Sequence, residues 1–211
     1  MKRANNSLWL IVTTLILASG SPILAGSLNC SVADAQGDAL WEATSPSPEV
    51  QPYRDIVQIE ATKVGRSVFI FAMDMASEVP NSPTFLLPSV AQMFWVWRLD
   101  TDPSTAPAGY PETPGISTPF EFVVRVIWDG GSFRGEVIDR RPLLTGGSAL
   151  VRPAPFKISR ATISVSVDSE SLGDPGSFRW GAGTVDWLVD QQGNLGGSLL
   201  DSVPLTYCPA T

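Results

Sequence analysis

EFVVRVIWDGGSFRGEVID, residues 121–139, is the clearest β-hairpin in the chain. Residues 121–128 and 133–139 flank Asp129-Gly130-Gly131-Ser132, a sequence typical of the tight turn that joins two antiparallel strands. Alternate side chains of a strand point to the same face. We therefore expect one apolar row of the first strand to point into a core: Phe122, Val124, Val126 and Trp128.

Further strands are predicted on both sides of this hairpin, where apolar residues alternate between clusters of Gly, Pro, Asn and Asp. They cover residues 55–61, 68–75, 94–100, 161–168 and 178–185. Apolar residues occupy both faces of segment 68–75, which predicts a central strand covered on both sides. The only helical element that we expect is a single turn at residues 169–172.

Loops and turns make up much of the rest, because 18 Gly and 18 Pro residues favour turns over long helices. We expect no regular structure in the proline-rich segment 101–119, and a polar, Gly-rich loop at 190–197. Long loops on a rigid sheet often carry binding sites. The sequence predicts an all-β fold, an antiparallel β-sandwich, with a closed β-barrel as the alternative.

The first residues are typical of an export signal. Lys2 and Arg3 precede an apolar stretch, residues 8–18, and Ser19, Gly20 and Pro22 end it. That stretch is shorter than the roughly twenty residues that span a bilayer, although an uncleaved anchor is the alternative. We predict a signal peptide at 1–27 and a single domain at 28–211. The mature protein is expected to be secreted or periplasmic, free or associated with the cell surface, and not inserted in the membrane.

Cys30 and Cys208 are the only two cysteines. In an exported protein such a pair predicts a disulfide, here between the first and last strand regions. The chain-entropy model gives an upper value of about 5 kcal/mol for so long a loop. The alternatives are two free thiols or a lipidated Cys30, although Ser27-Leu28-Asn29 departs from the usual sequence before a lipidated cysteine.

The charge of the chain limits its partners. The net charge is -7, and without Lys2 and Arg3 it becomes -9. A surface this acidic suits cations and neutral ligands and argues against nucleic acid. The chain contains no histidine, so it cannot build a Ser-His-Asp or Cys-His site.

Two acidic segments suggest a hard, oxygen-seeking cation such as calcium. Asp100 and Asp102 follow a predicted strand and point the same way, so their carboxylates repel unless a cation lies between them. Asp34 and Asp38 flank a glycine near the mature start, and Glu121 lies just beyond the proline-rich segment. Solvated surface acids are the alternative reading.

The order of several short motifs resembles secreted bacterial β-sandwiches of the family-nine carbohydrate-binding-module and DOMON-like group. These motifs are Asp34-Ala35-Gln36-Gly37-Asp38-Ala39, Asp55-Ile56-Val57, Phe94-Trp95-Val96-Trp97-Arg98-Leu99-Asp100-Thr101-Asp102, Leu172-Gly173-Asp174 and Phe178-Arg179-Trp180. The resemblance implies a jelly-roll-like sandwich that binds a sugar, haem or no ligand. It also implies structural calcium, with Asp34, Asp38, Asp100, Asp102 and Glu121 as ligands. Similar proteins often have Gly-x-Asp-Tyr where this chain has Pro119-Phe120-Glu121-Phe122.

The ligands that the resemblance implies can be compared with the residues present. Haem-binding relatives use Met and His, and this chain has no His, so we predict no haem and place Met73, Met75 and Met93 in the core. Sugar binding needs exposed aromatic faces. Trp41 and Trp187 lie outside the most regular segments and are the candidates, whereas the other tryptophans of the mature chain are expected in the core.

The sequence thus predicts an exported, monomeric, non-catalytic binding module, stabilised by calcium, with a carbohydrate or cell-surface glycan as ligand. One alternative is a structural or interaction domain of the cell envelope that needs no small ligand. The other is a glycoside-active enzyme, which requires two carboxylates about 5 to 10 Å apart across a cleft. Asp100 and Asp102 could be imagined in those roles, but neighbouring positions on one face of a strand favour chelation over flanking a sugar.

Overall fold

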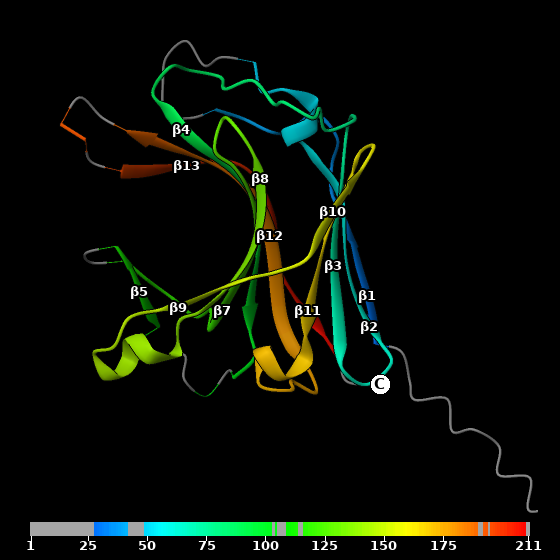
Figure 1. The fold of residues 1–211 in the computed structure, drawn as a ribbon. Helices are drawn as coiled ribbons and strands as arrows, with labels where there is room; N and C mark the ends of the chain where they lie inside the picture. The colour runs from blue at the N-terminus through cyan, green and yellow to red at the C-terminus, as the bar shows by residue number, and fades with distance from the viewer. Residues whose placement is uncertain are drawn as a thin grey trace, which may run out of the picture.

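Two antiparallel β-sheets face each other in a computed structural model of the chain (Figure 1). The structure describes residues 28–41, 49–102, 104, 109–113, 116–189, 192–193 and 195–209. The two sheets are not joined into a closed barrel, so the predicted β-sandwich is confirmed. The proposed signal peptide, residues 1–27, lies outside the described residues.

One sheet has five strands and the other has six. In spatial order the first contains β1 (Asn29–Ala33), β2 (Ile56–Val64), β3 (Val68–Met75), β11 (Thr162–Asp168) and β10 (Phe156–Ser159). The second contains β13 (Leu195–Cys208), β12 (Phe178–Val189), β4 (Val90–Asp100), β7 (Phe122–Trp128), β8 (Phe133–Asp139) and β9 (Leu150–Pro153). Short 3-10 turns connect them: η1 (Pro52–Arg54), η3 (Arg141–Thr145) and η4 (Ser169–Leu172), the last at the predicted helical turn.

The hairpin of β7 and β8 forms as predicted, with Trp128 opposite Phe133. The side chain of Asp129 holds the turn, because its Oδ1 accepts hydrogen bonds from the N–H groups of Gly131 and Ser132 at 3.0 and 2.9 Å. The apolar row of β7 points into the core and is buried. Local turn chemistry and alternation are therefore sufficient to define this element.

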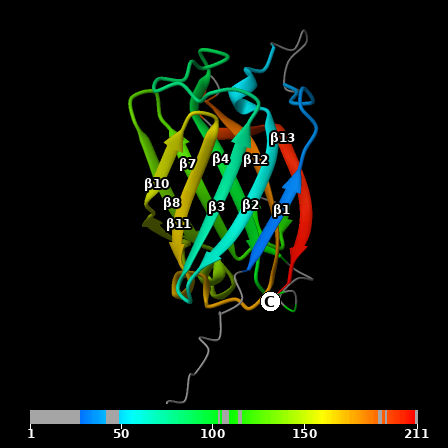
Figure 2. The same ribbon diagram turned by 90° about the vertical axis from the view of Figure 1, so that its right-hand side faces the viewer.

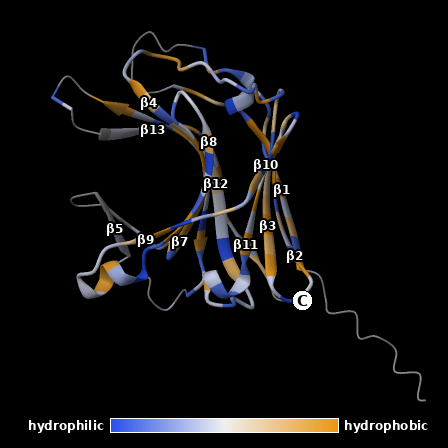
Figure 3. Cartoon of the chain, viewed as in Figure 1, coloured by the Kyte–Doolittle hydropathy of each residue, from blue (hydrophilic) through white to orange (hydrophobic). Residues whose placement is uncertain are grey.

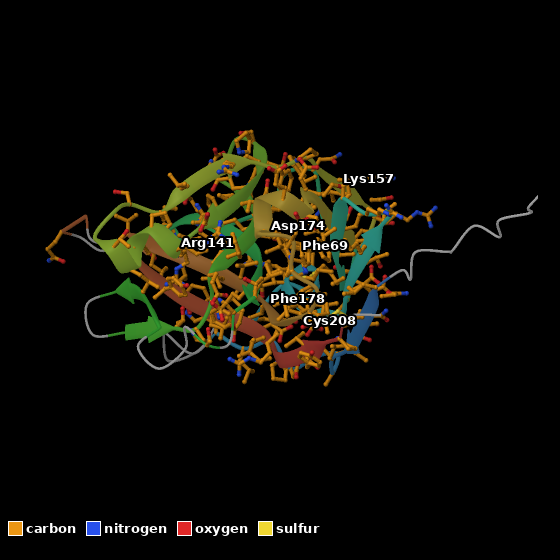
Figure 4. The ribbon with its side chains drawn as sticks, turned by 90° about the horizontal axis from the view of Figure 1, so that it is seen from below. Phe69, Arg141, Lys157, Asp174, Phe178 and Cys208 are labelled. Atoms are coloured by element: carbon orange, nitrogen blue, oxygen red, sulfur yellow. A yellow bond between two sulfur atoms is a disulfide. The ribbon has the colours of Figure 1, made fainter. Side chains whose placement is uncertain are left out.

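The core lies between the sheets and is rich in aromatic rings. Phe69 of β3 packs edge-on against Phe178 of β12 at 5.6 Å, and both are labelled in the view from below (Figure 4). The three methionines expected in the core are buried there. Along the strands, hydrophobic and hydrophilic residues alternate (Figure 3), as one buried and one wetter face require.

The disulfide between Cys30 and Cys208 is present, as predicted. It joins β1 to β13, two edge strands of different sheets that lie side by side in Figure 2. The two Cα atoms are 5.8 Å apart and 178 residues separate the cysteines in sequence. The bond therefore closes the corner of the sandwich where both ends of the described chain meet.

Three expectations about the strands were wrong. β3 is central in its sheet, but Val68, Ile70 and Ala72 on its second face are only half-buried, so one face alone is covered by the core. The proline-rich segment contains a small two-stranded sheet, β5 (Tyr110–Thr113) and β6 (Ile116–Thr118). Such a sheet tolerates Pro111 because each of its strands is an edge strand.

The supposed Gly-rich loop is in part a strand, because β13 begins at Leu195 and includes Gly196 and Gly197. β12 also continues to Val189 to pair with it. Pairing with a neighbour that is remote in sequence overrides the weak local preference of glycine. Among the described residues, no helix is long and apolar enough to span a bilayer.

Candidate metal centre

Three aspartates converge where the segment after β1 meets β13. Asp34, Asp38 and Asp201 each offer one carboxylate oxygen, and these oxygens lie within 4.8 Å of one another. Asp34 follows β1 directly, Asp38 lies four residues later, and Asp201 is part of β13. The structure thus brings together two of the five predicted ligands and adds one that the sequence did not suggest.

A fourth carboxylate, that of Asp55, reaches the same segment from the start of β2. Its Oδ2 accepts a hydrogen bond of 2.8 Å from the N–H of Gly37, between the two predicted ligands. Asp55 is 5% exposed, and its Oδ1 is buried without a hydrogen-bond partner, as is Oδ2 of Asp34. Buried acceptors of this kind are costly to leave unpaired, so both oxygens are suited to a cation.

The environment of Asp201 disfavours its negative charge. The side chain is 7% exposed and accepts a hydrogen bond of 2.5 Å from the N–H of Ile56. Burial, followed by the negative charges of Asp34 and Asp38, raises the pKa of Asp201 to about 6 against the opposing effect of that hydrogen bond. Burial also raises the pKa of Asp34, with further contributions from Asp38 and Asp55. A divalent cation would relieve this repulsion.

Backbone bonds hold the segment after β1 in place. The N–H of Asp34 donates to the carbonyl of Val57 at 2.9 Å, and the N–H of Leu40 donates to the carbonyl of Leu200 at 2.8 Å. Between them the chain turns at Gly37, whose φ of +89° is accessible to glycine without strain. The segment is therefore fastened to both sheets, which fixes the acidic side chains relative to one another.

A buried ion pair anchors the turn that carries Asp55. Arg54 is fully buried, and its Nη2 lies 2.7 Å from Oδ1 of Asp186 on β12. The guanidinium also lies 4.9 Å from the ring centroid of Trp95, and the carbonyl of Arg54 accepts a hydrogen bond from Thr184 Oγ1 at 2.7 Å. These contacts tie η1 to the six-stranded sheet next to Asp201.

The other three predicted ligands lie at the opposite end of the sandwich and have other partners. Asp100 is fully buried and forms an ion pair with Arg179. Glu121 is buried and accepts a hydrogen bond of 2.7 Å from the N–H of Thr101. Asp102 is exposed, and hydrogen bonds from the hydroxyl and then the N–H of Ser104 lower its pKa.

The prediction of one site for all five acids is therefore wrong, and strand direction explains why. β4 and β13 are both antiparallel to β12, so they run the same way, whereas the disulfide places the start of β1 at the end of β13. The carboxyl ends of β1 and β4 consequently point to opposite ends of the molecule. On β12, Asp100 lies opposite Arg179 and Asp201 lies opposite Thr184. Arg179 and Thr184 are five residues apart, so the two acids are separated by about 17 Å along the strand direction.

The two candidate tryptophans also differ from each other. Trp41 is only 1% exposed and packs with Val90 and Leu200, because the segment after β1 folds back onto β13, so the expectation that its face is open was wrong. Trp187 is partly exposed on β12, and its ring centroid lies 5.3 Å from that of Phe94.

Asp55 and Asp201 are the residues that sequence reasoning missed. In the sequence, Asp55 is the first residue of a predicted strand and belongs to one of the motifs of the resemblance. Its contact with Gly37 is a feature of the fold. Asp201 lies in β13, whose glycines hid the strand. Its pairing with Thr184 depends on a register shift in the ladder of β12 and β13, which no local pattern encodes.

A polar cavity of about 620 Å³ lies at the end of the sandwich opposite to the four aspartates. Its lining combines two arginines with three acids, and Arg141 and Asp174 are labelled in the view from below (Figure 4). Arg141 is already bound by Asp139 through two hydrogen bonds of 2.9 and 2.7 Å. Among the described residues, only the aspartate cluster brings three potential metal ligands within 4.8 Å of one another, so the cavity is not the better candidate metal centre.

In comparisons with known proteins, no family model matches the chain, and no curated protein is significantly similar to it. The site must accordingly be judged on its own geometry. That geometry is three carboxylates with oxygens within 4.8 Å of one another, and a fourth, that of Asp55, bonded to the segment that carries two of them. Asp55 and Asp201 are more than nine-tenths buried, and Asp34 and Asp55 each have one oxygen without a hydrogen-bond partner.

Proposed function

We propose that this protein is an exported, non-catalytic binding module, stabilised by a calcium ion at Asp34, Asp38, Asp55 and Asp201, with a carbohydrate or cell-surface glycan as ligand. The observation that carries the calcium part is the burial of Asp55 and Asp201 beside two further carboxylates. The charges that raise the pKa of Asp201 are both negative. Asp34 is half-buried and Asp38 is exposed, so the cluster is open to solvent on one side, but its two buried carboxylates are costly unless protons or a cation neutralise them.

Calcium suits the cluster better than magnesium or zinc. Carboxylate oxygens are the ligands of hard cations, and calcium accepts irregular coordination completed by water. Magnesium requires near-octahedral geometry, and zinc in proteins is held mostly by Cys and His, of which this chain has two bridged Cys and no His. The chain's own residues would hold the ion, which would cross-link β1, β2 and β13.

Export and a binding role are supported by separate observations. A disulfide persists in oxidising compartments, which agrees with the predicted signal peptide. The acids proposed for glycoside chemistry are poorly suited to it, because the reaction needs one carboxyl group with a raised pKa. Arg179 neutralises Asp100, and hydrogen bonds from Ser104 lower the pKa of Asp102.

Thermal unfolding in calcium and in EDTA tests the calcium part. At a calcium concentration one hundred times the dissociation constant, linkage gives about 2.7 kcal/mol, which corresponds to a rise in Tm of roughly 5 to 10 °C for a domain of this size. The rise should disappear in Asp201→Asn and persist in Asp102→Asn. Equal melting temperatures of the native protein in calcium and in EDTA would refute the proposed site.

One observation favours the alternative, an interaction domain without a small ligand. Four large apolar side chains are 37 to 56% exposed along the segment that crosses from η3 to β10: Leu144, Leu150, Val151 and Phe156. A run of exposed apolar side chains along one segment is typical of a contact between proteins. Co-purification of a partner that Val151→Ser releases would support this alternative.

A further inference from the structure

The outer face of the six-stranded sheet, which points away from the core, carries a second set of residues with a defined arrangement. The sheet is curved, with its concave side away from the five-stranded sheet (Figure 1). Phe94 lies on this outer face because Met93 and Trp95 point into the core. Trp187 lies there because Asp186 points inward to Arg54.

Trp187 presents a supported aromatic surface on this face. Its ring packs on Phe94, which is only 3% exposed and so acts as a base beneath the partly exposed indole. Gly197 lies directly opposite Trp187 on β13. A Cβ at that glycine would lie 3.6 Å from the indole Nε1, so the missing side chain leaves this edge of the ring uncovered.

A donor and an acceptor lie on the other side of the same phenyl ring. The guanidinium of Arg125 lies 5.1 Å from the ring centroid of Phe94. Arg125 also donates from Nε and Nη2 to Oε2 of Glu136, directly opposite on β8, at 3.0 and 2.7 Å. Both side chains stay partly exposed, at 21 and 15%. The indole and the ion pair are thus neighbours across Phe94.

Several charges on this face are paired within the protein. Besides the pair of Arg125 and Glu136, Arg134 pairs with both Glu136 and Asp129. A ligand with a strong charge of its own would have to break such pairs. A neutral ligand with many hydroxyl groups would instead add hydrogen bonds to polar atoms that are already held in place.

We propose that Trp187, Phe94, Arg125 and Glu136, here called the outer-face platform, bind neighbouring sugar rings of a neutral polysaccharide. This inference rests on the proposed function and names the surface that performs it. The apolar C–H face of one ring would stack on the indole, and hydroxyl groups of a neighbouring ring along the polysaccharide would donate to Glu136 and accept from Arg125. Phe94 is a positioning residue, since it holds both the indole and the guanidinium.

Isothermal titration of the calcium-loaded full domain tests this proposal with cellohexaose, xylohexaose, mannohexaose and maltohexaose as neutral probes and polygalacturonate as a charged one. We expect one neutral probe or more to bind. Trp187→Ala should weaken that binding by roughly tenfold or more, as for a truncated aromatic anchor. Gly197→Leu should also weaken it, because the added side chain covers the indole.

Matched controls separate a lost contact from a damaged fold. Tyr207 is 60% exposed and lies opposite Arg179 at the far end of β13, so Tyr207→Ala should leave the affinity unchanged. A Cβ at Gly196 would meet no atom within 4 Å, so Gly196→Ala should also be neutral. All four variants should melt within a few degrees of the native protein, which circular dichroism checks.

The outcomes distinguish this proposal from the proposed function. Neutral-sugar binding that survives both Trp187→Ala and Gly197→Leu overturns the platform and leaves the function standing. Binding of polygalacturonate alone, or self-association of the native protein that Trp187→Ala abolishes, also overturns the platform. Absence of any sugar binding overturns the platform and the carbohydrate part of the function, while calcium binding is judged independently by the melting experiment.

Discussion

The two ends of the sandwich contain the same residue type in opposite electrostatic situations. At one end Asp34, Asp38 and Asp201 face one another. At the other, Asp100 and Asp139 each face an arginine. In the sequence the two sets look alike, and the motif Asp100-Thr101-Asp102 is the more suggestive of the two. The difference teaches that an acid indicates a cation site only when the fold leaves it without a cationic side chain.

The largest loss of stability is expected when a buried acid of the core loses the arginine with which it forms an ion pair. Arg54→Met would leave Asp186 buried and unpaired, which costs about 3 to 5 kcal/mol. The reason is that both side chains are almost completely buried, at 0 and 1% exposure. Urea denaturation measures the loss, with Arg66→Met on an exposed turn as the control. A loss no larger than that of the control would show that the pair does not anchor η1.

Breaking the ion pair at the far end should have a smaller effect. Arg179→Met removes the partner of Asp100, but the guanidinium is 40% exposed, so water screens the pair. We expect a cost of about 1 to 2 kcal/mol. The double variant Arg179→Met, Asp100→Asn should recover part of the stability, because the buried charge is gone. If the double variant is less stable than the single one, Asp100 has a role beyond this pair.

A change of pH should alter the contributions of the two ends to stability in opposite directions. In EDTA the folded state holds a proton on Asp201 up to a pH of about 6, whereas the unfolded chain releases it near 3.8. The contribution of Asp201 to stability is therefore lost as the pH rises through this window. At the other end, burial would raise the pKa of Asp139, but the bonds from Arg141 outweigh burial and lower it. The contribution of Asp139 is therefore lost as the pH falls.

Free energies of unfolding between pH 3 and pH 7 check this contrast when Asp201→Asn and Asp139→Asn are each compared with the native protein. Above pH 6 in EDTA, Asp201→Asn should be more stable than the native protein by about 1 kcal/mol, because it removes a repelled charge. Asp139→Asn should be less stable there. Two differences of the same sign would contradict the assignment of a repelled and a paired acid.

Features that depend on residues adjacent in the sequence could be predicted, whereas features that depend on residues far apart in the sequence could not. The hairpin at Asp129 depends on adjacent residues and was predicted with its turn. The disulfide followed from having only two cysteines. In contrast, β13 contains Gly196 and Gly197 and forms because β12 pairs with it. A strand that is stabilised mainly by pairing with another strand cannot be recognised from its own sequence pattern.

The candidate site needed still longer-range information. The two predicted residues that do lie close together, Asp34 and Asp38, belong to one short segment, whereas Asp201 lies more than 160 residues away in the chain, in β13. Grouping Asp100 with Asp34 required β1 and β4 to end at the same side, and the strand order does not allow this. Trp41 was misplaced for a related reason, since the segment that contains it is bonded back to Leu200.

Counting the calcium bound per chain tests the central contrast most directly. Equilibrium dialysis against calcium at neutral pH should find one ion per molecule of native protein. The same count is expected for Asp102→Asn, and none for the double variant Asp55→Asn, Asp201→Asn. An ion that stays bound to this double variant and is lost from Asp102→Asn would place the site at the far end of the sandwich and contradict this account.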